Sequence, residues 1–294
     1  MRLNRRDFIK SLSATAVTPL FIRPAFINGE LSESNSSESS NNNTTILFDS
    51  SRCIGCHECE KACREWNYIP QEKQSWTLVK PVPGLTKNDG ELLFGKYQCM
   101  HCKDAACIRV CPTGALSRHS SGFVAYDIDK CSGCGYCMQF CPFKAPFMEG
   151  NVITGLQIMQ KCTFCQNRLE IGRQAACVEA CPTNALMQGN RNSIVNIAKA
   201  RISYIHKDYP DAVLYGENEL EGLHVIYILT KSPSVYALPE SPEIPAATLV
   251  WKDLIQPLGF ISAGLLILGL GLNYLIARSQ LGDKEPTDNK LEKK

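Results

Sequence analysis

Cysteine is the residue whose number and spacing set this chain apart. Sixteen of the 294 residues are cysteines, and they form four groups of four with none left over. The first and third groups have the spacing C-x2-C-x2-C-x3-C, whereas the second widens the middle gap to four residues and the fourth widens it to eleven. In chain order the groups are Cys53, Cys56, Cys59 and Cys63; Cys99, Cys102, Cys107 and Cys111; Cys131, Cys134, Cys137 and Cys141; and Cys162, Cys165, Cys177 and Cys181.

Several kinds of chemistry use closely spaced thiols, and the spacing separates them. Zinc binds C-x2-C pairs, but a three-cysteine loop followed by a distant fourth cysteine is not zinc-ribbon spacing. Cysteines three residues apart rarely form a disulfide with each other, and a redox dithiol accounts for only one C-x-x-C. A C-x2-C-x2-C loop, in contrast, can curl around one face of a cubane and place three sulfurs on three irons. The sequence therefore predicts four [4Fe–4S] clusters held by all sixteen cysteines.

The residues around the cysteines fit this interpretation. Gly55, Gly133 and Gly135 leave room for backbone N–H groups to approach the cluster sulfides. Proline follows the last cysteine in three of the groups and turns the chain away, so the last cysteine is expected to bind the neighbouring cluster. The stretches AACIRVCPTGAL (105–116) and AACVEACPTNAL (175–186) match at eight of twelve positions, which indicates duplication of a cluster-binding unit.

The segment between the second and third groups predicts which cysteines share a cluster. It contains ALSRHSSGFVAYD (115–127), which is typical of a hairpin that turns at Ser-Ser-Gly and of a compact two-cluster ferredoxin. These two groups should therefore exchange their last cysteines, and the first and fourth groups, left at the ends, should pair in the same way. The expected ligand sets are Cys53, Cys56, Cys59 and Cys181 (cluster 1); Cys63, Cys162, Cys165 and Cys177 (cluster 2); Cys99, Cys102, Cys107 and Cys141 (cluster 3); and Cys111, Cys131, Cys134 and Cys137 (cluster 4).

Some basic residues also lie within or beside the cysteine motifs. The histidines are expected to be solvated or to support the ligands, because each motif already has its four cysteines. The lysines either raise the cluster potentials or are simply solvated, and the sequence leaves both interpretations open. These residues are His57, His101, Lys61, Lys103, Lys130 and Lys161.

The amino-terminal segment indicates export. Arg5 and Arg6 precede an uncharged stretch of modest hydrophobicity at residues 11–22, which is typical of a twin-arginine signal. Because this route carries folded proteins, clusters can be assembled in the reducing cytoplasm before export. The expected signal covers residues 1–28, and the polar residues 29–45 are expected to be a disordered linker.

The rest of the chain divides at its prolines and at one long apolar stretch. Residues 193–207 have the spacing of an amphipathic helix, and residues 223–229 are typical of a buried strand. Residues 258–277 carry no charge, and at about 1.5 Å per residue they just span a hydrocarbon core of about 30 Å. The tail beyond is rich in lysine, which favours a cytoplasmic carboxyl terminus. The expected division is a four-cluster ferredoxin-like domain at 46–232 with an inner dicluster unit at 98–145, a proline-rich strap at 233–250, a transmembrane anchor at 251–277 and a cytoplasmic tail at 278–294.

Composition and the absence of several known motifs exclude some classes of function. With 31 basic and 29 acidic residues the formal charge is +2, which argues against a nucleic-acid partner. The sequence contains no nucleotide-binding loop, no catalytic triad and no group of clustered carboxylates, so no catalytic residues are expected. The expected fold class is α+β, with two interleaved bacterial-ferredoxin-like dicluster units and one carboxyl-terminal transmembrane helix.

Five stretches of the chain resemble the four-cluster electron-transfer subunits of molybdopterin-type respiratory oxidoreductases. The likeness is closest to the iron–sulfur (β) subunit of membrane-bound formate dehydrogenase. It covers most of the chain from residue 46 to the apolar stretch, and all sixteen ligand positions are filled. The stretches are CIGCHECEKACREWN, CMHCKDAACIRVCP, CSGCGYCMQFCPF, CTFCQNRLEIGRQAACVEACPTNAL and LPESPEI…WKDLIQPL.

The resemblance implies partners and a direction for electron flow. The partners are a larger catalytic subunit with molybdenum or tungsten bound to a pterin, and a cytochrome b or quinone-reactive membrane subunit. Electrons would enter at the Cys53 cluster and leave from the Cys131 cluster. The leader, the single apolar span and the lysine-rich tail, taken together, predict a cluster domain on the periplasmic side of the inner membrane.

Two alternatives remain open. A leader on the β chain is more typical of the related ferredoxin-type subunit of membrane-bound hydrogenase, so hydrogen is the alternative electron donor to formate. The alternative of another class is an exported iron–sulfur or metal-binding protein without a redox partner.

Overall fold

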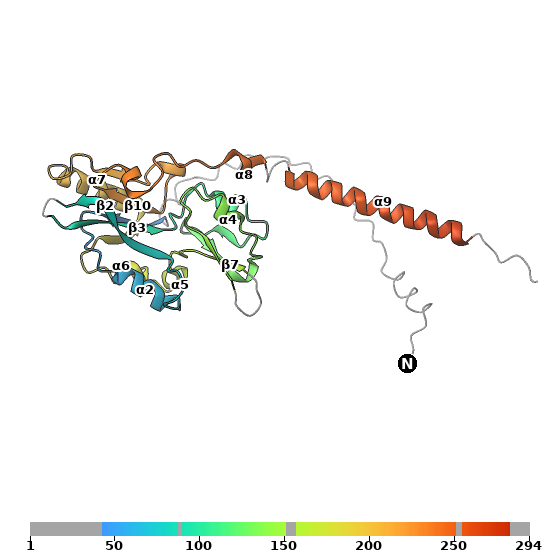
Figure 1. Ribbon diagram of the computed structural model, residues 1–294, viewed down its shortest axis with the longest axis horizontal. Helices are drawn as coiled ribbons and strands as arrows, with labels where there is room; N and C mark the ends of the chain where they lie inside the picture. Colours follow the sequence, from blue (N-terminus) through green and yellow to red (C-terminus); the bar gives the residue numbers. More distant parts are fainter. Residues whose placement is uncertain (1–42, 88–89, 151–156, 251–254, 283–294) are drawn as a thin grey trace, which may run out of the picture. The chain divides into compact units, whose positions relative to one another are not determined.

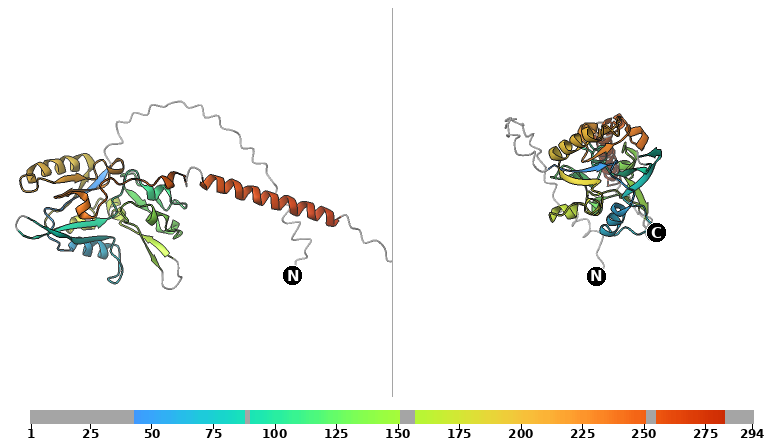
Figure 2. Two further views of the ribbon diagram at one scale, coloured as in Figure 1. Left: turned by 45° about the horizontal axis from the view of Figure 1, so that its top comes forward. Right: turned by 90° about the vertical axis from the view of Figure 1, so that its left-hand side faces the viewer.

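The computed structural model of the protein describes residues 43–87, 90–150, 157–250 and 255–282 (Figures 1 and 2). The predicted twin-arginine signal and most of the predicted linker and tail lie outside these residues. The strands are β1 (Thr44–Asp49), β2 (Thr77–Thr86), β3 (Leu92–Gln98), β4 (Leu116–Arg118), β5 (Val124–Tyr126), β6 (Phe147–Gly150), β7 (Gln157–Gln160), β8 (Leu186–Asn190), β9 (Val213–Tyr215) and β10 (Val225–Leu229). The helices are α2 (Glu58–Trp66), α3 (Ala106–Arg109), α4 (Tyr136–Gln139), α5 (Gln166–Glu170), α6 (Ala176–Glu179), α7 (Arg191–Ile205), α8 (Ala246–Val250) and α9 (Gln256–Gly282), with short 3-10 turns η2 (Ile128–Lys130), η3 (Glu219–Glu221) and η4 (Pro233–Tyr236).

A four-stranded sheet joins the beginning of the cysteine-rich body to its end. The strand order is β8-β1-β10-β9, and β1 runs parallel to β10 although nearly the whole body separates them in sequence. Every residue of β10 is buried, because its run of β-branched, leucine and tyrosine side chains packs on both faces of the sheet. This strand confirms the prediction of a buried strand within residues 223–229.

The first strand corrects the predicted boundary between linker and body. The linker was expected to extend to residue 45, but Thr44 and Thr45 already belong to β1, where they pair with Asn190 and Gly189 of β8. Threonine is polar by composition, yet its branched Cβ suits a strand, and Thr45 is fully buried. The ordered body therefore begins earlier than polarity alone suggests.

Helix α7 covers one side of this sheet, and α2 and α6 lie on the other side (Figures 1 and 2). The helix was predicted at residues 193–207 and begins two residues earlier, because the Asn190 side chain accepts a hydrogen bond from the backbone N–H of Asn192 at 3.0 Å and caps it. Ile194, Ala198 and Ile205 form its buried face.

Two pairs of strands stand in the same place relative to the cysteine motifs. In the inner part of the chain β4 follows the Cys-Pro-Thr segment at Cys111, β5 precedes Cys131, and the two strands form the predicted hairpin. In the outer part β8 follows the Cys-Pro-Thr segment at Cys181, β1 precedes Cys53, and these strands also pair antiparallel. The helices repeat the pattern, since α3 packs against α4 and α2 packs against α6.

The segment predicted as an extended strap contains local helix. Residues 233–236 form η4, and the Tyr236 hydroxyl lies 2.7 Å from Thr230 Oγ1 and 3.1 Å from Ser50 Oγ inside the core. These hydrogen bonds fix the start of the strap to the sheet. Farther on, α9 includes a stretch at 257–279 with a mean hydropathy of 2.0, which by length and composition is able to cross a membrane.

Candidate metal centres

Three cavities in the body are each lined by four cysteines, and each set combines two of the sequence groups. The equal numbers of cysteines indicate the same kind of occupant in all three cavities. Site 1 is lined by Cys53, Cys56, Cys59 and Cys181, site 2 by Cys63, Cys162, Cys165 and Cys177, and site 4 by Cys111, Cys131, Cys134 and Cys137.

The four remaining cysteines form a fourth set, site 3. Burial raises the pKa of the Cys102 thiol well above its usual value, and the nearby thiols of Cys99, Cys107 and Cys141 raise it further. The structure thus brings together each of the four ligand sets expected from the sequence, and it brings together no set made of one sequence group alone.

The chemistry of these sites fits a cluster better than a single ion or a disulfide. All sixteen cysteines are free thiols, and within the described ranges no three histidine, cysteine, aspartate or glutamate side chains converge on one metal position. A cubane needs such separated sulfurs, because each iron takes its own cysteine. Burial raises the pKa of the Cys59, Cys63 and Cys107 thiols to about 12, so only a strongly cationic core would bind them as thiolates.

The sites follow one another in a row. Burial is the main cause of the raised thiol pKa values, and cysteines of the adjacent site are a further cause. Cys177 of site 2 raises the pKa of Cys59 in site 1, and Cys99 of site 3 raises that of Cys162 in site 2. Cys137 of site 4 raises the pKa of Cys107 in site 3. These neighbour relations give the order 1-2-3-4.

The ends of the row differ from its middle in exposure. Cys56 of site 1 and Cys134 of site 4 are exposed, whereas their counterparts in the middle, Cys102 and Cys165, are half-buried and buried. Electrons would therefore reach a partner most readily at the two ends.

All four C-x2-C loops share one backbone feature. The residue before the second cysteine has a positive φ in each loop: 69° at Gly55, 50° at His101, 71° at Gly133 and 61° at Phe164. This conformation curls the loop back on itself and is favourable for glycine but strained for other residues. The glycines were predicted to give backbone room, and the structure adds that the end sites use glycine while the middle sites do not.

Close packing adds to the requirement for glycine at the ends. A Cβ atom at Gly55 would lie 2.3 Å from the ring of Phe94, and one at Gly133 would lie 2.1 Å from the carbonyl oxygen of Gln157. Gly135 also has a positive φ, of 77°, but nothing lies within 4 Å of the place a Cβ would take. Gly135 therefore serves the backbone turn, whereas Gly55 and Gly133 also allow a close approach.

In the middle, aromatic packing holds the strained residues. The rings of His101 and Phe164 meet edge to face with centroids 4.9 Å apart, and Phe123 stacks on Phe164 at 4.8 Å. All three side chains are fully buried. His101 Nδ1 accepts a hydrogen bond from the Val124 N–H at 3.2 Å, and burial lowers its pKa well below the usual value, so this histidine is neutral. The strain is thus offset by a core that joins two cysteine loops.

Several side chains approach the cysteine sulfurs directly. Asn67 Nδ2 donates to Cys63 Sγ at 3.6 Å, and the backbone N–H of Phe164 donates to Cys162 Sγ at 3.4 Å. The duplicated Cys-Pro-Thr segments place a hydroxyl at the same point twice, since Thr113 Oγ1 lies 3.7 Å from Cys111 Sγ and Thr183 Oγ1 lies 3.8 Å from Cys181 Sγ. Donors to sulfur stabilise the more negative, reduced cluster.

The structure also sorts the lysines near the cysteines. Lys61, Lys103 and Lys130 are exposed, which favours the solvated interpretation for them. Lys161 is buried, and its Nζ donates to the backbone oxygen of Cys162 at 2.9 Å and of Val124 at 3.1 Å.

Sequence reasoning missed a further buried lysine, Lys96 on β3, which is 1% exposed. Its signal was present: strand alternation puts Lys96 on the same face as Phe94, which packs against the Gly55 loop. Burial lowers the pKa of Lys96, but the negative charge that the cysteines of sites 1 and 2 carry when ionised, led by Cys177 and Cys59, outweighs burial and raises the pKa above its usual value.

Comparison with known proteins agrees with this arrangement. Two family models described as "4Fe-4S dicluster domain" match residues 52–116 and 91–191. The chain is 32% identical to the iron–sulfur subunit of the nitrate-inducible formate dehydrogenase of Escherichia coli K12, over 93% of this chain and 96% of the relative. It is 34% identical to the formate dehydrogenase iron–sulfur subunit of Haemophilus influenzae, over 78% of this chain and 79% of the relative.

The chain belongs to the iron–sulfur subunits of formate dehydrogenases. The chain is also similar to the hydrogenase-2 operon protein HybA of Escherichia coli O157:H7, with 29% identity over 96% of this chain and 97% of the relative. The resemblance inferred from the cysteine motifs is thereby confirmed, and so is the prediction of four [4Fe–4S] clusters. The α+β class is consistent with the mixed helix and strand content and the two dicluster domains.

Proposed function

We propose that this iron–sulfur subunit relays electrons through clusters at sites 1, 2, 3 and 4, from a catalytic subunit that oxidises formate to a quinone-reactive cytochrome b subunit in the membrane. Each site holds one [4Fe–4S] cluster, bound by the four cysteines that line it. The observation that carries the proposal is the row of four cysteine sets with an exposed cysteine at each end, Cys56 and Cys134. A row with open ends and a buried middle is suited to conduction between two partners.

The fold supports this ligand assignment. The outer strand pair β8–β1 and the inner pair β4–β5 stand in the same relation to their cysteines, so sites 1 and 2 form one ferredoxin-like unit and sites 3 and 4 form a second, inserted within the first. Interleaving places the two units end to end along one electron path.

The electron donor is tested on the complex purified from membranes without oxygen. Formate should bleach the broad visible absorbance and generate the signals of reduced clusters in electron paramagnetic resonance. Reduction by hydrogen but not by formate would favour the hydrogenase relay, which HybA supports as the second candidate. A protein that purifies alone, with clusters reduced only by dithionite, would contradict both and favour the iron–sulfur protein without a redox partner.

The direction is tested with a matched pair of substitutions at the two exposed cysteines. In Cys56→Ala, which disrupts site 1, formate should no longer reduce the remaining clusters. In Cys134→Ala, which disrupts site 4, formate should still reduce sites 1 to 3, but quinone reduction should be lost. The opposite result for the two variants would reverse the direction.

The location follows from α9 and the amino-terminal arginines. We place the cluster domain on the periplasmic side of the inner membrane, anchored by the apolar residues of α9, with the carboxyl terminus in the cytoplasm. Protease added to intact spheroplasts should digest the cysteine-rich body and leave a carboxyl-terminal tag protected. Digestion of the tag would contradict this orientation.

Export is tested separately. Replacing Arg5 and Arg6 with lysine should retain the protein in the cytoplasm with its four clusters intact. Continued export would mean that a partner subunit supplies the signal instead.

A further inference from the structure

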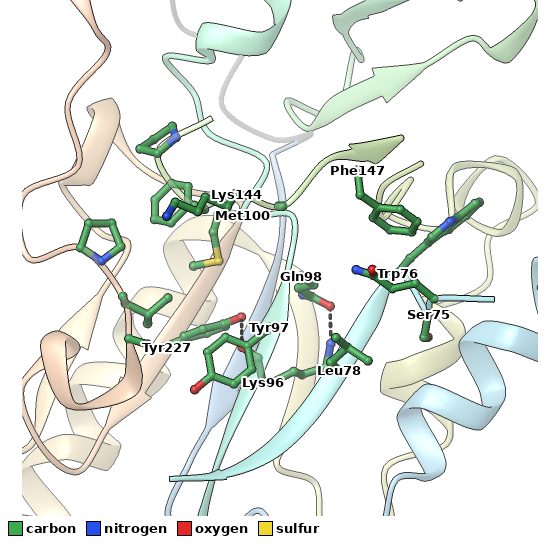
Figure 3. A pocket seen from close by; sticks show the side chains of 17 residues that line it. Ser75, Trp76, Leu78, Lys96, Tyr97, Gln98, Met100, Lys144, Phe147 and Tyr227 are labelled. Atoms are coloured by element: carbon green, nitrogen blue, oxygen red, sulfur yellow. Dashed lines mark hydrogen bonds between the residues drawn. The ribbon is translucent and has the colours of Figure 1, made fainter. Parts of the chain in front are cut away.

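The ammonium group of Lys96 is buried, and no carboxylate of the described residues pairs with it. Its Nζ donates to Thr77 Oγ1 at 2.5 Å. Nζ also donates to Gln98 Oε1, and the backbone oxygen of Lys96 accepts from the Tyr227 hydroxyl at 2.7 Å (Figure 3). None of the ion pairs formed within the described parts of the chain includes Lys96. Burying an ammonium group is strongly unfavourable unless a negative charge is near. Two neutral oxygens do not supply that charge, so another anion must.

Lys96 lies in the wall between sites 1 and 2. It lines the site 1 cavity together with Cys53, Cys59 and the other cysteines of that set. Its two hydrogen-bond acceptors, Thr77 and Gln98, line the site 2 cavity. The lysine therefore faces one cluster position, and the groups that hold it face the next. The anions that compensate the buried charge are the cysteine-ligated clusters at sites 1 and 2.

The junction between sites 2 and 3 is built in the same way. Lys161 is 1% exposed, and its Nζ donates to the backbone oxygen of the site 2 cysteine Cys162 and to Val124 on β5. Val124 in turn donates its backbone N–H to Nδ1 of His101, the residue before the site 3 cysteine Cys102, so Lys161 also lies near site 3. Among the ion pairs of the described residues, none includes Lys161 either. Among the described residues, no lysine or arginine lines the site 4 cavity.

We propose that Lys96 raises the reduction potentials of the clusters at sites 1 and 2, and that Lys161 does the same at sites 2 and 3, while site 4 has no such buried cation. Each one-electron reduction adds one negative charge to a cluster. A fixed ammonium group nearby stabilises that added charge, and the low dielectric of the interior strengthens the effect. The reduction potential of the site 2 cluster is raised most, because this site lies between the two lysines. This inference rests on the proposed ligand sets.

The test is a redox titration of the full complex followed by electron paramagnetic resonance. Lys96→Met keeps an unbranched side chain, one heavy atom shorter, and removes its charge. The clusters at sites 1 and 2 should become harder to reduce by at least tenfold in equilibrium constant, which is about 59 mV for one electron. The reduction potentials of the clusters at sites 3 and 4 should change by less than that. Lys161→Met should shift sites 2 and 3 instead.

Lys61→Met is the matched control, because Lys61 lies between two cysteines of the first group but is exposed. It should leave all four potentials in place. Lys96→Gln is the second variant, since it keeps a hydrogen-bond donor and is gentler on the fold. A wild-type complex without four clusters would contradict the proposed function itself. Four intact clusters with unchanged potentials at sites 1 and 2 in Lys96→Met, or an equal shift at all four sites, would overturn only this inference. Loss of the clusters in both Lys96 variants would also overturn it, by assigning Lys96 to assembly.

Discussion

The two ends of the cysteine row and its middle use different means to form the same loop. At the ends, Gly55 and Gly133 adopt the positive φ without strain, and an exposed cysteine follows each of them. In the middle, His101 and Phe164 adopt the same φ under strain and are held by a buried aromatic core. The difference shows that the cysteine spacing sets the loop, while the surroundings decide which residue can form it. Open ends favour exchange with partners, and a packed middle keeps water away from the inner clusters.

The largest effect is expected in the middle. Phe164→Ala removes a fully buried ring that contacts His101 and Phe123, so the free energy of unfolding should fall by about 3–5 kcal/mol. The measurement is anaerobic urea denaturation followed by loss of the cluster absorbance. Ile54→Ala in the first loop, where the side chain is 49% exposed, is the control and should change the value by about 0.5 kcal/mol or less. An equal decrease in the free energy of unfolding in the two variants would contradict the distinction between the middle of the row and its ends.

A smaller effect is expected from glycine substitutions at one end. Gly135→Ala puts a side chain at a positive φ with open space around it and should cost about 1–2 kcal/mol of unfolding free energy. Gly133→Ala carries the same strain and also forces a Cβ against the Gln157 carbonyl oxygen, so it should cost more and lower the iron content at site 4. The comparison is made by the same denaturation and by iron analysis. If the two variants behaved alike, the close approach at Gly133 would have no energetic weight.

The smallest effect is expected at the hydroxyl groups that the two ends share. Thr113→Val and Thr183→Val each remove a hydrogen bond to a sulfur, worth about 1 kcal/mol. Thr113→Val should lower the reduction potential of the site 4 cluster, and Thr183→Val that of the site 1 cluster. Each decrease should be smaller than the decrease of about 59 mV expected for Lys96→Met. Redox titration of both variants checks this. A shift at an inner site would contradict the assignment of these threonines to the ends.

Much of this site could be predicted from the sequence, because cysteine spacing directly reflects cluster geometry. The groups, the hairpin at residues 115–127 and the duplicated segments led to the same four sets that the structure brings together. The strand at 223–229 and the helix near 193–207 were also predicted, since their apolar periodicity is long and clear.

What could not be predicted depends on contacts between distant segments. The positive φ of His101 and Phe164 has no local signal, because it is held by a ring from another loop. Strand alternation puts Lys96 on the same face as the apolar Phe94, but its position between two cysteine sets depends on how β3 packs in the folded body. The parallel pairing of β1 with β10 likewise appears only after the whole body has folded.

The central claim is that the last cysteine of each group serves the neighbouring cluster, and one pair of substitutions tests it most directly. Cys63 belongs by sequence to the first group but lines site 2, whereas Cys181 belongs to the fourth group but lines site 1. In electron paramagnetic resonance of the reduced complex, Cys63→Ser should alter the cluster at site 2 and leave the Cys53 cluster unchanged. Cys181→Ser should alter the Cys53 cluster and leave site 2 unchanged. If Cys63→Ser altered the Cys53 cluster instead, each group would bind its own cluster and the row described here would be wrong.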